Sequence, residues 1–531
     1  MLVRQMIPCS SGFLDLQIRS DNHTANIYPW YVLAVLLLVY VLNFIDRQII
    51  SILAQDIKAS LRVSDTQLGF LYGTTFAIIY TVFGIPIARL ADRWHRVPII
   101  GLGLGTWSAM SALSGLASSY GQLMLARIGV AIGEAGATPA AYSLLSDYFP
   151  SRRRALAIGI YYTGLSVGAG LSLSLGGWIS HTWSSSFPAG AAPLGLAGWQ
   201  AAFLAVGLPG LFLALWVLSL REPARGSSEG QHLPAAAAGT WRTFAQELAA
   251  ILPPLTFLSL ARFPRTLSRN LLFFVMLTLA VSGLARLSGD WAQWIACGLG
   301  TYAVGSWLQM LRATDRPTFV LLLGTRPAVL TLLALCGLAF ITYSLAFWIP
   351  PYVMRTFGVR ADIAGVGLGV PGMFAASFGA VAGGYLSDRW KGHDMRGRLF
   401  VCMLSVALTV PTTVAILIAG SDRSIYVLYA LFQFVTSLTA GSGATAVQEF
   451  VLPRMRATAG AILLLAYCGG LALGPYATAR LSSLTGSLRI GMLGVLAMAP
   501  IALCMFGLAA RDIGRAEATR LERARAAGEF C

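Results

Sequence analysis

The sequence predicts an all-α polytopic membrane protein with two six-helix bundles and an extra helical hairpin between them. The first observation is composition: 56% of the 531 residues are hydrophobic and only 11% are charged, whereas soluble domains carry about 25% charged residues. The second is the recurrence of apolar runs about 20 residues long, the length that crosses a bilayer as a helix. The third is that short charged motifs occur in the same order in both halves of the chain.

Apolar runs predict six spans in each half. In the first half they cover 28–53, 66–90, 97–117, 121–148, 155–182 and 199–220, and in the second half 325–350, 362–388, 397–420, 425–449, 457–482 and 489–510. The predicted units are therefore a leader at 1–27, a first bundle at 28–221, a linker at 222–324, a second bundle at 325–510 and a tail at 511–531.

Basic residues gather in alternate loops of this arrangement. The net charge is +16, but clusters such as Arg152–Arg154 and Arg389–Arg398 are short and separated by apolar runs. This is the positive-inside pattern of membrane proteins, and it predicts that the leader, the tail and both termini are cytoplasmic. We expect a multi-pass, monomeric protein of the cell inner (plasma) membrane. Its expected partner is the lipid bilayer, and we expect it not to bind nucleic acid.

The sequence offers no motif for a cofactor, a metal or an enzyme. The seven Cys occur singly, without the spacing of a metal site. No GxxxxGK[ST] phosphate-binding loop occurs, which disfavours an ATP-driven pump. We therefore expect no cofactor, no bound metal and no enzymatic activity.

The linker contains two further apolar runs, near 270–286 and 291–311. Both are borderline in length for spans. We favour a membrane-inserted hairpin, peripheral to both bundles, because it preserves the orientation of the second half. Helices lying flat in the membrane interface are the alternative, which Trp291, Trp294 and Trp307 would suit.

The first span carries polar residues where apolar ones are expected. Asn43, Asp46 and Arg47 lie inside the run from Trp30 to Leu53. A charge in the hydrocarbon layer costs at least a few kcal/mol, so such residues usually face a bundle interior and mark a transport pathway. The alternative is that Asp46 begins a solvated loop, although the apolar pattern continues beyond it.

A charged motif is repeated between the halves. Asp92-Arg93 in the first half is matched by Asp388-Arg389, 296 residues later, and the pair Asp147 and Arg154 is matched by Glu449 and Arg456 at an offset of 302 residues. Parallel six-span repeats describe a transporter architecture with the substrate site between the halves. We predict that these eight residues pair with one another and gate one side of the protein. The alternative is that they are solvated loop charges, whose single ion pairs are weak.

These motifs resemble the major facilitator superfamily, whose signature is G-x-L-x-D-R between spans two and three. Within it the chain resembles the Spinster-like branch, through Asn43–Arg47, Arg127 with Gly133-Glu134-Ala135, Asp147-Tyr148-Phe149, Gly198-Trp199 with Phe203, and Arg221-Glu222-Pro223. The resemblance implies the major facilitator fold and proton-driven carriage of lysophospholipids or sphingoid lipids. It covers both halves but not 226–316, and Ala88, Val97 and Gln200 depart from the pattern.

Charged residues are predicted to form the centre of the first half. Helical rise places Asp46 and Arg127 at similar depths, so we expect them to pair, and it places Glu134 near the midplane on the same helix face as Arg127. A carboxylate that loses its Arg partner gains a proton. Asp46 is therefore the expected principal proton-coupling residue and Glu134 the second. A permanent ion pair that only orders the fold is the alternative.

The same centre is expected to bind the substrate. An Arg guanidinium suits a phosphate or carboxylate head group, and Arg47 and Arg127 are expected to face the cavity. The remaining predicted substrate-binding residues are neutral: Asn43, Tyr343, Gln433 and Thr436. Three of these come from the second half, which carries no charge at the positions matching Asp46, Arg127 and Glu134.

Two kinds of secondary active transporter fit these residues. The first hypothesis is a proton-coupled carrier of an amphiphilic lipid that works by alternating access. The second is a proton-coupled carrier of a small organic anion or drug. A lipid carrier needs an apolar cavity half and a lateral opening, whereas an anion carrier needs a closed polar pocket. A receptor or scaffold is disfavoured because the gating motif occurs in both halves.

Overall fold

The computed structural model describes residues 27–91, 94–187, 191–224, 245, 248–249, 252, 255–261 and 264–529. The predicted leader lies outside the described residues except for Ile27, and Asp92 and Arg93 also lie outside them. Within the described residues every regular element is a helix, and twelve helices are long and apolar enough to cross a membrane. The all-α membrane class predicted from composition is therefore confirmed.

The first half of the structure runs from α1 to α8. Its elements are α1 (Ile27–Leu61), α2 (Asp65–Gly69), the π-helical turn η1 (Phe70–Thr75), α3 (Phe76–Ala91), α4 (Arg96–Ser114), α5 (Tyr120–Glu134), α6 (Ala137–Tyr148), α7 (Ser151–Ser186), the 3-10 turn η2 (Pro193–Gly195) and α8 (Gly198–Leu218). The second span is continuous through α2, η1 and α3. It begins at a capping box in which Ser64 Oγ accepts from Gln67 N at 3.1 Å and Gln67 Oε1 accepts from Ser64 N at 2.8 Å.

The second half repeats this plan from α14 to α22. Its elements are α14 (Arg326–Phe357), α15 (Ala361–Lys391), α16 (Gly397–Ile418), α17 (Asp422–Ser437), α18 (Thr439–Glu449), the 3-10 turn η4 (Pro453–Met455), α19 (Arg456–Thr485), α20 (Leu488–Val495), α21 (Met498–Ala518) and α22 (Arg520–Ala526). The fourth span is interrupted in both halves, between α5 and α6 and between α17 and α18. The start of the predicted tail continues the last span as part of α21.

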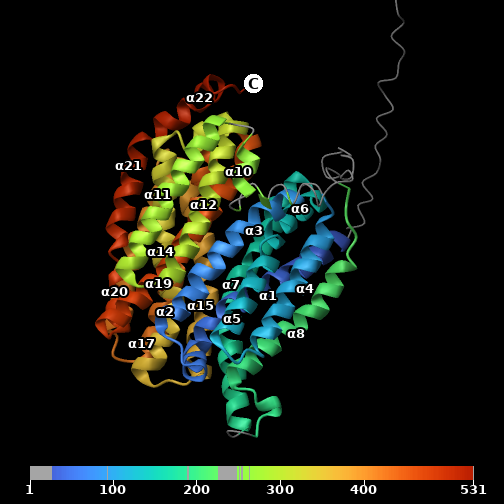
Figure 1. The fold of residues 1–531 in the computed structure, drawn as a ribbon, viewed down its shortest axis with the longest axis vertical. Coiled ribbons are helices and arrows are strands. Elements are labelled where there is room, and N and C mark those ends of the chain that lie inside the picture. Colours follow the sequence, from blue (N-terminus) through green and yellow to red (C-terminus); the bar gives the residue numbers. More distant parts are fainter. Residues whose placement is uncertain are drawn as a thin grey trace, which may run out of the picture.

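The helices between the halves whose bounds the structure describes are α10 (Leu255–Leu260), α11 (Pro264–Ser288), α12 (Trp291–Thr314) and α13 (Arg316–Leu322). α11 and α12 form the hairpin predicted in the linker, and they stand alongside the other long helices (Figure 1). α11 exposes residues such as Leu272 and Leu279. α12, in contrast, packs against α3, where a Cβ on Gly300 would lie 2.3 Å from Ile78 Cδ1. The hairpin therefore contacts the first half through α12, and its predicted peripheral role stays a prediction.

Two seams join the halves. In one, α7 packs against α15, and a Cβ on Gly170 would lie 2.5 Å from the carbonyl oxygen of Gly369. In the other, α2 and η1 pack along α19, and a Cβ on Gly73 would lie 2.6 Å from the carbonyl oxygen of Leu471. Small residues at such crossings let helix backbones touch, so neither seam leaves room for a larger side chain.

The two ends of the molecule differ in how the halves meet. The chain enters α1 and leaves α21 at the end we call the terminus side, the upper end in Figure 1, and the opposite end is the far side. On the far side, Arg355 of α14 pairs with Asp65 of α2 at 2.6 Å and donates to Gln55 of α1 at 2.8 Å. Farther along the same two spans, the rings of Tyr72 and Phe347 stack with their centroids 4.2 Å apart. The far side is thus closed by contacts between the halves.

Candidate functional site

A buried ion pair joins α1 to α5. Arg127 Nη1 donates to Asp46 Oδ1 at 2.9 Å, and Nη2 donates to the Asp46 carbonyl oxygen at 3.1 Å. The two side chains are 2% and 1% exposed. Ser111 of α4 also donates to Asp46 Oδ1. The predicted pairing of Asp46 with Arg127 is confirmed, and the alternative that Asp46 begins a solvated loop is wrong. Arg127 is almost fully buried against Asp46, and its role in substrate binding stays a prediction.

A second ion pair lies beside the first. Arg47 Nη2 donates to Glu134 Oε2 at 2.8 Å, and Glu134 is fully buried while Arg47 is 14% exposed. Three aromatic rings surround the guanidinium, with Cζ at 4.3 Å from the centroid of Phe76, 5.0 Å from Phe44 and 5.2 Å from Tyr80. Such rings attract a cation. The sequence ranked Glu134 second because it shares a helix with Arg127, but its partner is Arg47 on another helix.

Both pairs leave polar atoms without a hydrogen bond among the described residues. These are Asp46 Oδ2, Arg47 Nε and Glu134 Oε1. A buried polar atom that lacks a partner costs about 1–3 kcal/mol, so such atoms mark places where water, a proton or a ligand group gains by binding. Their concentration at one level of the first half identifies the candidate site.

The predicted neutral lining is only partly assembled around these pairs. Tyr343 of α14 is close enough to Arg47 to interact with it electrostatically, so it brings the second half to the site. Asn43 is buried in α1. Thr436 Oγ1 instead donates to the carbonyl oxygen of Phe432 on its own helix at 2.9 Å. Gln433 is partly buried and makes no side-chain hydrogen bond to the described residues.

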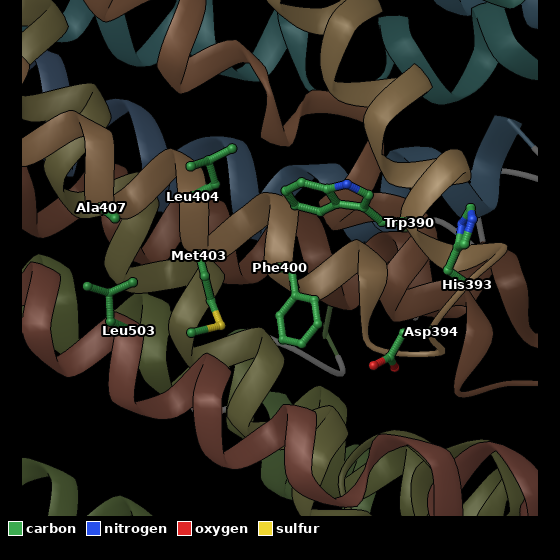
Figure 2. A pocket seen from close by; sticks show the side chains of 8 residues that line it. All are labelled: Trp390, His393, Asp394, Phe400, Met403, Leu404, Ala407 and Leu503. Carbon is green, nitrogen blue, oxygen red and sulfur yellow. The ribbon is translucent and has the colours of Figure 1, made fainter.

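Two cavities lie away from the ion pairs. One of about 550 Å³ lies between α16 and α21, where Phe400, Met403 and Leu503 point into an apolar space with Asp394 at one end (Figure 2). The other, of about 590 Å³, surrounds the Asp65–Arg355 pair on the far side. Neither is lined by the residues of the two buried pairs. The candidate site is therefore defined by its charges and not by these cavities.

On the terminus side, Arg96 forms a cluster of charges that sequence reasoning missed. Arg96 is fully buried at the start of α4. Its guanidinium pairs with Asp147 of α6, and its Nε donates to Glu222 Oε1 at 2.8 Å. Glu222 also accepts from the backbone N–H groups of Arg96 at 2.9 Å and Val97 at 2.8 Å. We call Arg96, Asp147 and Glu222 the first latch.

Hydrogen bonds shift the titration of Glu222, which follows the end of α8. Burial by itself would raise the pKa of this carboxyl group. The hydrogen bonds from Arg96 and from the two backbone N–H groups outweigh burial, and they hold the pKa of Glu222 below its usual value. Glu222 therefore carries its charge at neutral pH.

A corresponding cluster occurs in the second half. Glu449 forms an ion pair with Arg398 at 3.1 Å and lies 3.4 Å from Lys391, which also pairs with Glu517 at 2.8 Å. We call these four residues the second latch. Arg398 follows Arg96 by 302 residues, the offset that separates Glu449 from Asp147. That shared offset is the sequence signal that could have identified Arg96.

The other predicted gating residues differ in their surroundings. Asp388 is largely exposed and lies 3.7 Å from Arg398. Arg389 is exposed, with Nη1 at 3.5 Å from Tyr385 Oη. Arg154 lies in the first turn of α7, and Arg456 is exposed and pairs with no described acidic residue. For Glu449 the predicted pairing with the other repeated residues is wrong, because its basic partners are Arg398 and Lys391. For Asp147 the pairing stays a prediction, because Asp92 and Arg93 lie outside the described residues.

Comparisons with known proteins place this geometry in a family. The family model of the Major Facilitator Superfamily matches residues 36–475. An MFS-type efflux pump of Mycolicibacterium smegmatis is 29% identical over 474 residues, covering 88% of this chain and 87% of that protein. A probable L-galactonate transporter of Escherichia coli is 30% identical over 192 residues, covering 36% of this chain and 39% of that protein.

Solved structures agree with the sequence comparison. A crystal structure of a bacterial homologue of the human lysosomal transporter Spinster, in an inward-facing and unoccupied conformation, superposes with a TM-score of 0.70. It is 26% identical, with 93% of this chain and 99% of that chain covered. The chain therefore belongs to the Major Facilitator Superfamily and, within it, resembles the Spinster-like transporters.

Proposed function

We propose that this protein is a proton-coupled secondary carrier that moves an amphiphilic lipid, such as a lysophospholipid or a sphingoid lipid, by alternating access. The observation that carries the proposal is the Arg47–Glu134 pair. The Arg47 guanidinium is partly exposed, and its carboxylate partner Glu134 is fully buried. Arg47 also lies near Tyr343 of the second half. It is thus suited to exchange Glu134 for an anionic or zwitterionic head group.

Proton coupling follows from that exchange. When a head group occupies Arg47, Glu134 loses its counter-charge in a buried place, and burial then favours the protonated carboxyl group. Release of the substrate restores the ion pair and expels the proton. Asp46, the first choice from sequence, is less suited because its partner Arg127 is only 2% exposed and is thus shielded from the substrate.

The orientation is part of the proposal. The positive-inside rule assigns the terminus side, which holds both latches, to the cytoplasm of an inner (plasma) membrane. The far side, closed by Asp65 and Arg355, then faces outward. Similarity to an inward-facing Spinster homologue supports this assignment of state. A single chain contains both repeats, so a monomer suffices.

A small organic anion or drug is the second candidate substrate. Two relatives favour it, since one is named an efflux pump and the other a probable L-galactonate transporter. A carboxylate of a sugar acid would bind Arg47 by the same chemistry as a lipid phosphate. The two candidates differ in the apolar portion of the molecule and not in the charged group.

The test is transport by purified protein in liposomes under an imposed pH gradient. The substrate panel contains a lysophospholipid, a sphingoid phosphate and L-galactonate. We expect Glu134→Gln to abolish accumulation driven by the gradient while retaining counterflow exchange, which needs no net proton movement, and Arg47→Gln to abolish both. Arg360→Gln removes an exposed Arg paired only with Asp362 and serves as the matched control.

The outcomes separate the candidates. Accumulation of galactonate without lysophospholipid or sphingoid phosphate would replace the lipid by a small anion. Accumulation by Glu134→Gln equal to that of the parent protein would refute the coupling role of Glu134. If Asp46→Asn alone then lost accumulation while it kept counterflow, the role would pass to Asp46.

A further inference from the structure

We propose that the hairpin of α11 and α12 is a clamp that holds the far side closed, and that Asp290, Arg480, Gln293 and Thr74 set how often that side opens. The inference rests on the alternating access proposed above. It assigns a regulatory role to a segment outside the two six-helix halves. Its contacts reach both halves at the level where opening must occur.

The hairpin is held together by a buried polar network. Asn270 of α11 is fully buried and donates to Ser306 Oγ and to Gln309 Oε1 of α12, each at 3.0 Å. Tyr302 Oη donates to Asn270 Oδ1 at 2.7 Å. Since these groups have no better partners in an apolar layer, separating the two helices would leave them unsatisfied. The hairpin therefore moves as one body.

The hairpin is attached to the second half at both of its ends. At the tip, Asp290 accepts from Tyr476 of α19 and lies 3.6 Å from Arg480 Nε. Arg480 Nη2 also donates to the Ser288 carbonyl oxygen at 2.6 Å. At the base, beyond α12, Asp315 pairs with Arg454 of the second half at 3.3 Å. These contacts fix the hairpin to the second half at its two ends.

The face of α12 is attached to the first half. Gln293 Oε1 lies 2.7 Å from Thr74 Oγ1 in the π-helical turn, and Thr74 Oγ1 lies 2.6 Å from the carbonyl oxygen of Ala472 in α19. Thr74 is fully buried and Gln293 is 2% exposed. One threonine thus connects the first half, the second half and the hairpin. Farther along α12, Gly300 packs against Ile78 of α3.

Opening of the far side must break this arrangement. When the halves rock about the site, η1 and α19 separate at the far side. The hairpin travels with α19, so the contact between Gln293 and Thr74 is lost and α12 must slide on α3. These contacts exist only in the closed state, and a contact made in one state alone shifts the population toward that state.

The test measures the distance across the far side in the absence of substrate. Spin labels at Arg62→Cys and Leu484→Cys, in a background without the native Cys, report this distance by double electron–electron resonance in nanodiscs. We expect Thr74→Val and Gln293→Leu each to raise the ratio of open to closed protein by about 5-fold, the effect of losing one hydrogen bond. Thr278→Val removes a hydroxyl that bonds only to its own helix on α11, and it should leave the ratio unchanged.

A charge exchange tests the tip. Arg480→Asp should raise the open population, and the double variant Asp290→Arg with Arg480→Asp should restore the closed one, which a merely unfolded protein would not do. The clamp is refuted if none of these variants changes the distance distribution, or if Thr278→Val changes it equally. Because no substrate or proton gradient is used, failure of the clamp is distinct from failure of the proposed transport.

Discussion

The two halves are alike on the terminus side and unlike at the centre. Each has a latch in which an acidic residue at the end of the fourth span meets a basic residue near the start of the third: Asp147 with Arg96, and Glu449 with Arg398. Among the described residues, only the first half has buried ion pairs at its middle. The matching place in the second half holds Ser344, whose hydroxyl group lies 3.1 Å from the Gly474 carbonyl oxygen.

In the proposed mechanism this difference would separate two tasks. Features that occur in both halves would serve a movement in which both halves take part, since rocking needs matched surfaces on each side. Features that occur once would serve the binding of one substrate and one proton. Substitutions at corresponding positions of the two halves test this difference.

The largest effect is expected at the centre of the first half. Asp46→Asn leaves Arg127 buried without a counter-charge, and loss of one partner from a buried pair costs about 3–5 kcal/mol. We therefore expect a marked drop in apparent melting temperature, measured in detergent, although Asn has nearly the same size and shape as Asp. Tyr429→Phe, at the position matching Arg127, should cost no more than about 1.5 kcal/mol. Equal losses in the two variants would remove the distinction between the halves.

An intermediate effect is expected for the latches. Arg96 is fully buried and binds two carboxylates, so Arg96→Gln should destabilise the protein by about 1.5–3 kcal/mol. Arg398 is 18% exposed and binds Glu449 at 3.1 Å, so Arg398→Gln should cost about 1 kcal/mol or less. Thermal unfolding of both variants in the same detergent measures the difference. A larger loss for Arg398→Gln would show that the second latch, and not the first, is the stronger.

The smallest effect is expected from acidification. The pKa of Glu222 is lower in the folded protein than in the unfolded chain, so the folded state binds fewer protons as the pH approaches the usual carboxyl value. The stability that Glu222 contributes is complete above that value, about 4.3, and is lost as the pH falls through the lower folded pKa. Glu222→Gln should therefore show a shallower loss of apparent melting temperature below about pH 4.5 than the parent protein. Parallel curves would exclude Glu222 as the titrating group.

Sequence reasoning reached the fold and one of the two central pairs. Hydropathy and the repeated motifs predict two six-span halves, and helical rise places Asp46 level with Arg127. Depth alone could not assign Arg47, because adjacent residues on a helix point about 100° apart and their partners depend on the rotation and tilt of α1. The partner of Glu134 was missed for that reason. Arg96 was also missed, since one basic residue just before an apolar run carries no sign of burial.

The face of the hairpin that contacts the first half was not predicted from the sequence. Both of its helices are apolar, so composition predicts a membrane-like environment on every side and does not reveal which face contacts protein. The buried polar residues of the hairpin indicate which of its faces contact protein. Asn270 and Gln293 are costly in an apolar run unless they are paired, and each is paired, one within the hairpin and one with Thr74.

The placement of α12 also makes the two routes from the surrounding lipid unequal. The seam between α3 and α19 lies behind the hairpin, whereas no described helix covers the seam between α7 and α15 from outside. A molecule with a long hydrocarbon tail that approaches sideways from the membrane would therefore meet the hairpin on the α3–α19 flank. On the opposite flank it would meet α7 and α15 directly. The protein is consequently one-sided toward its bilayer.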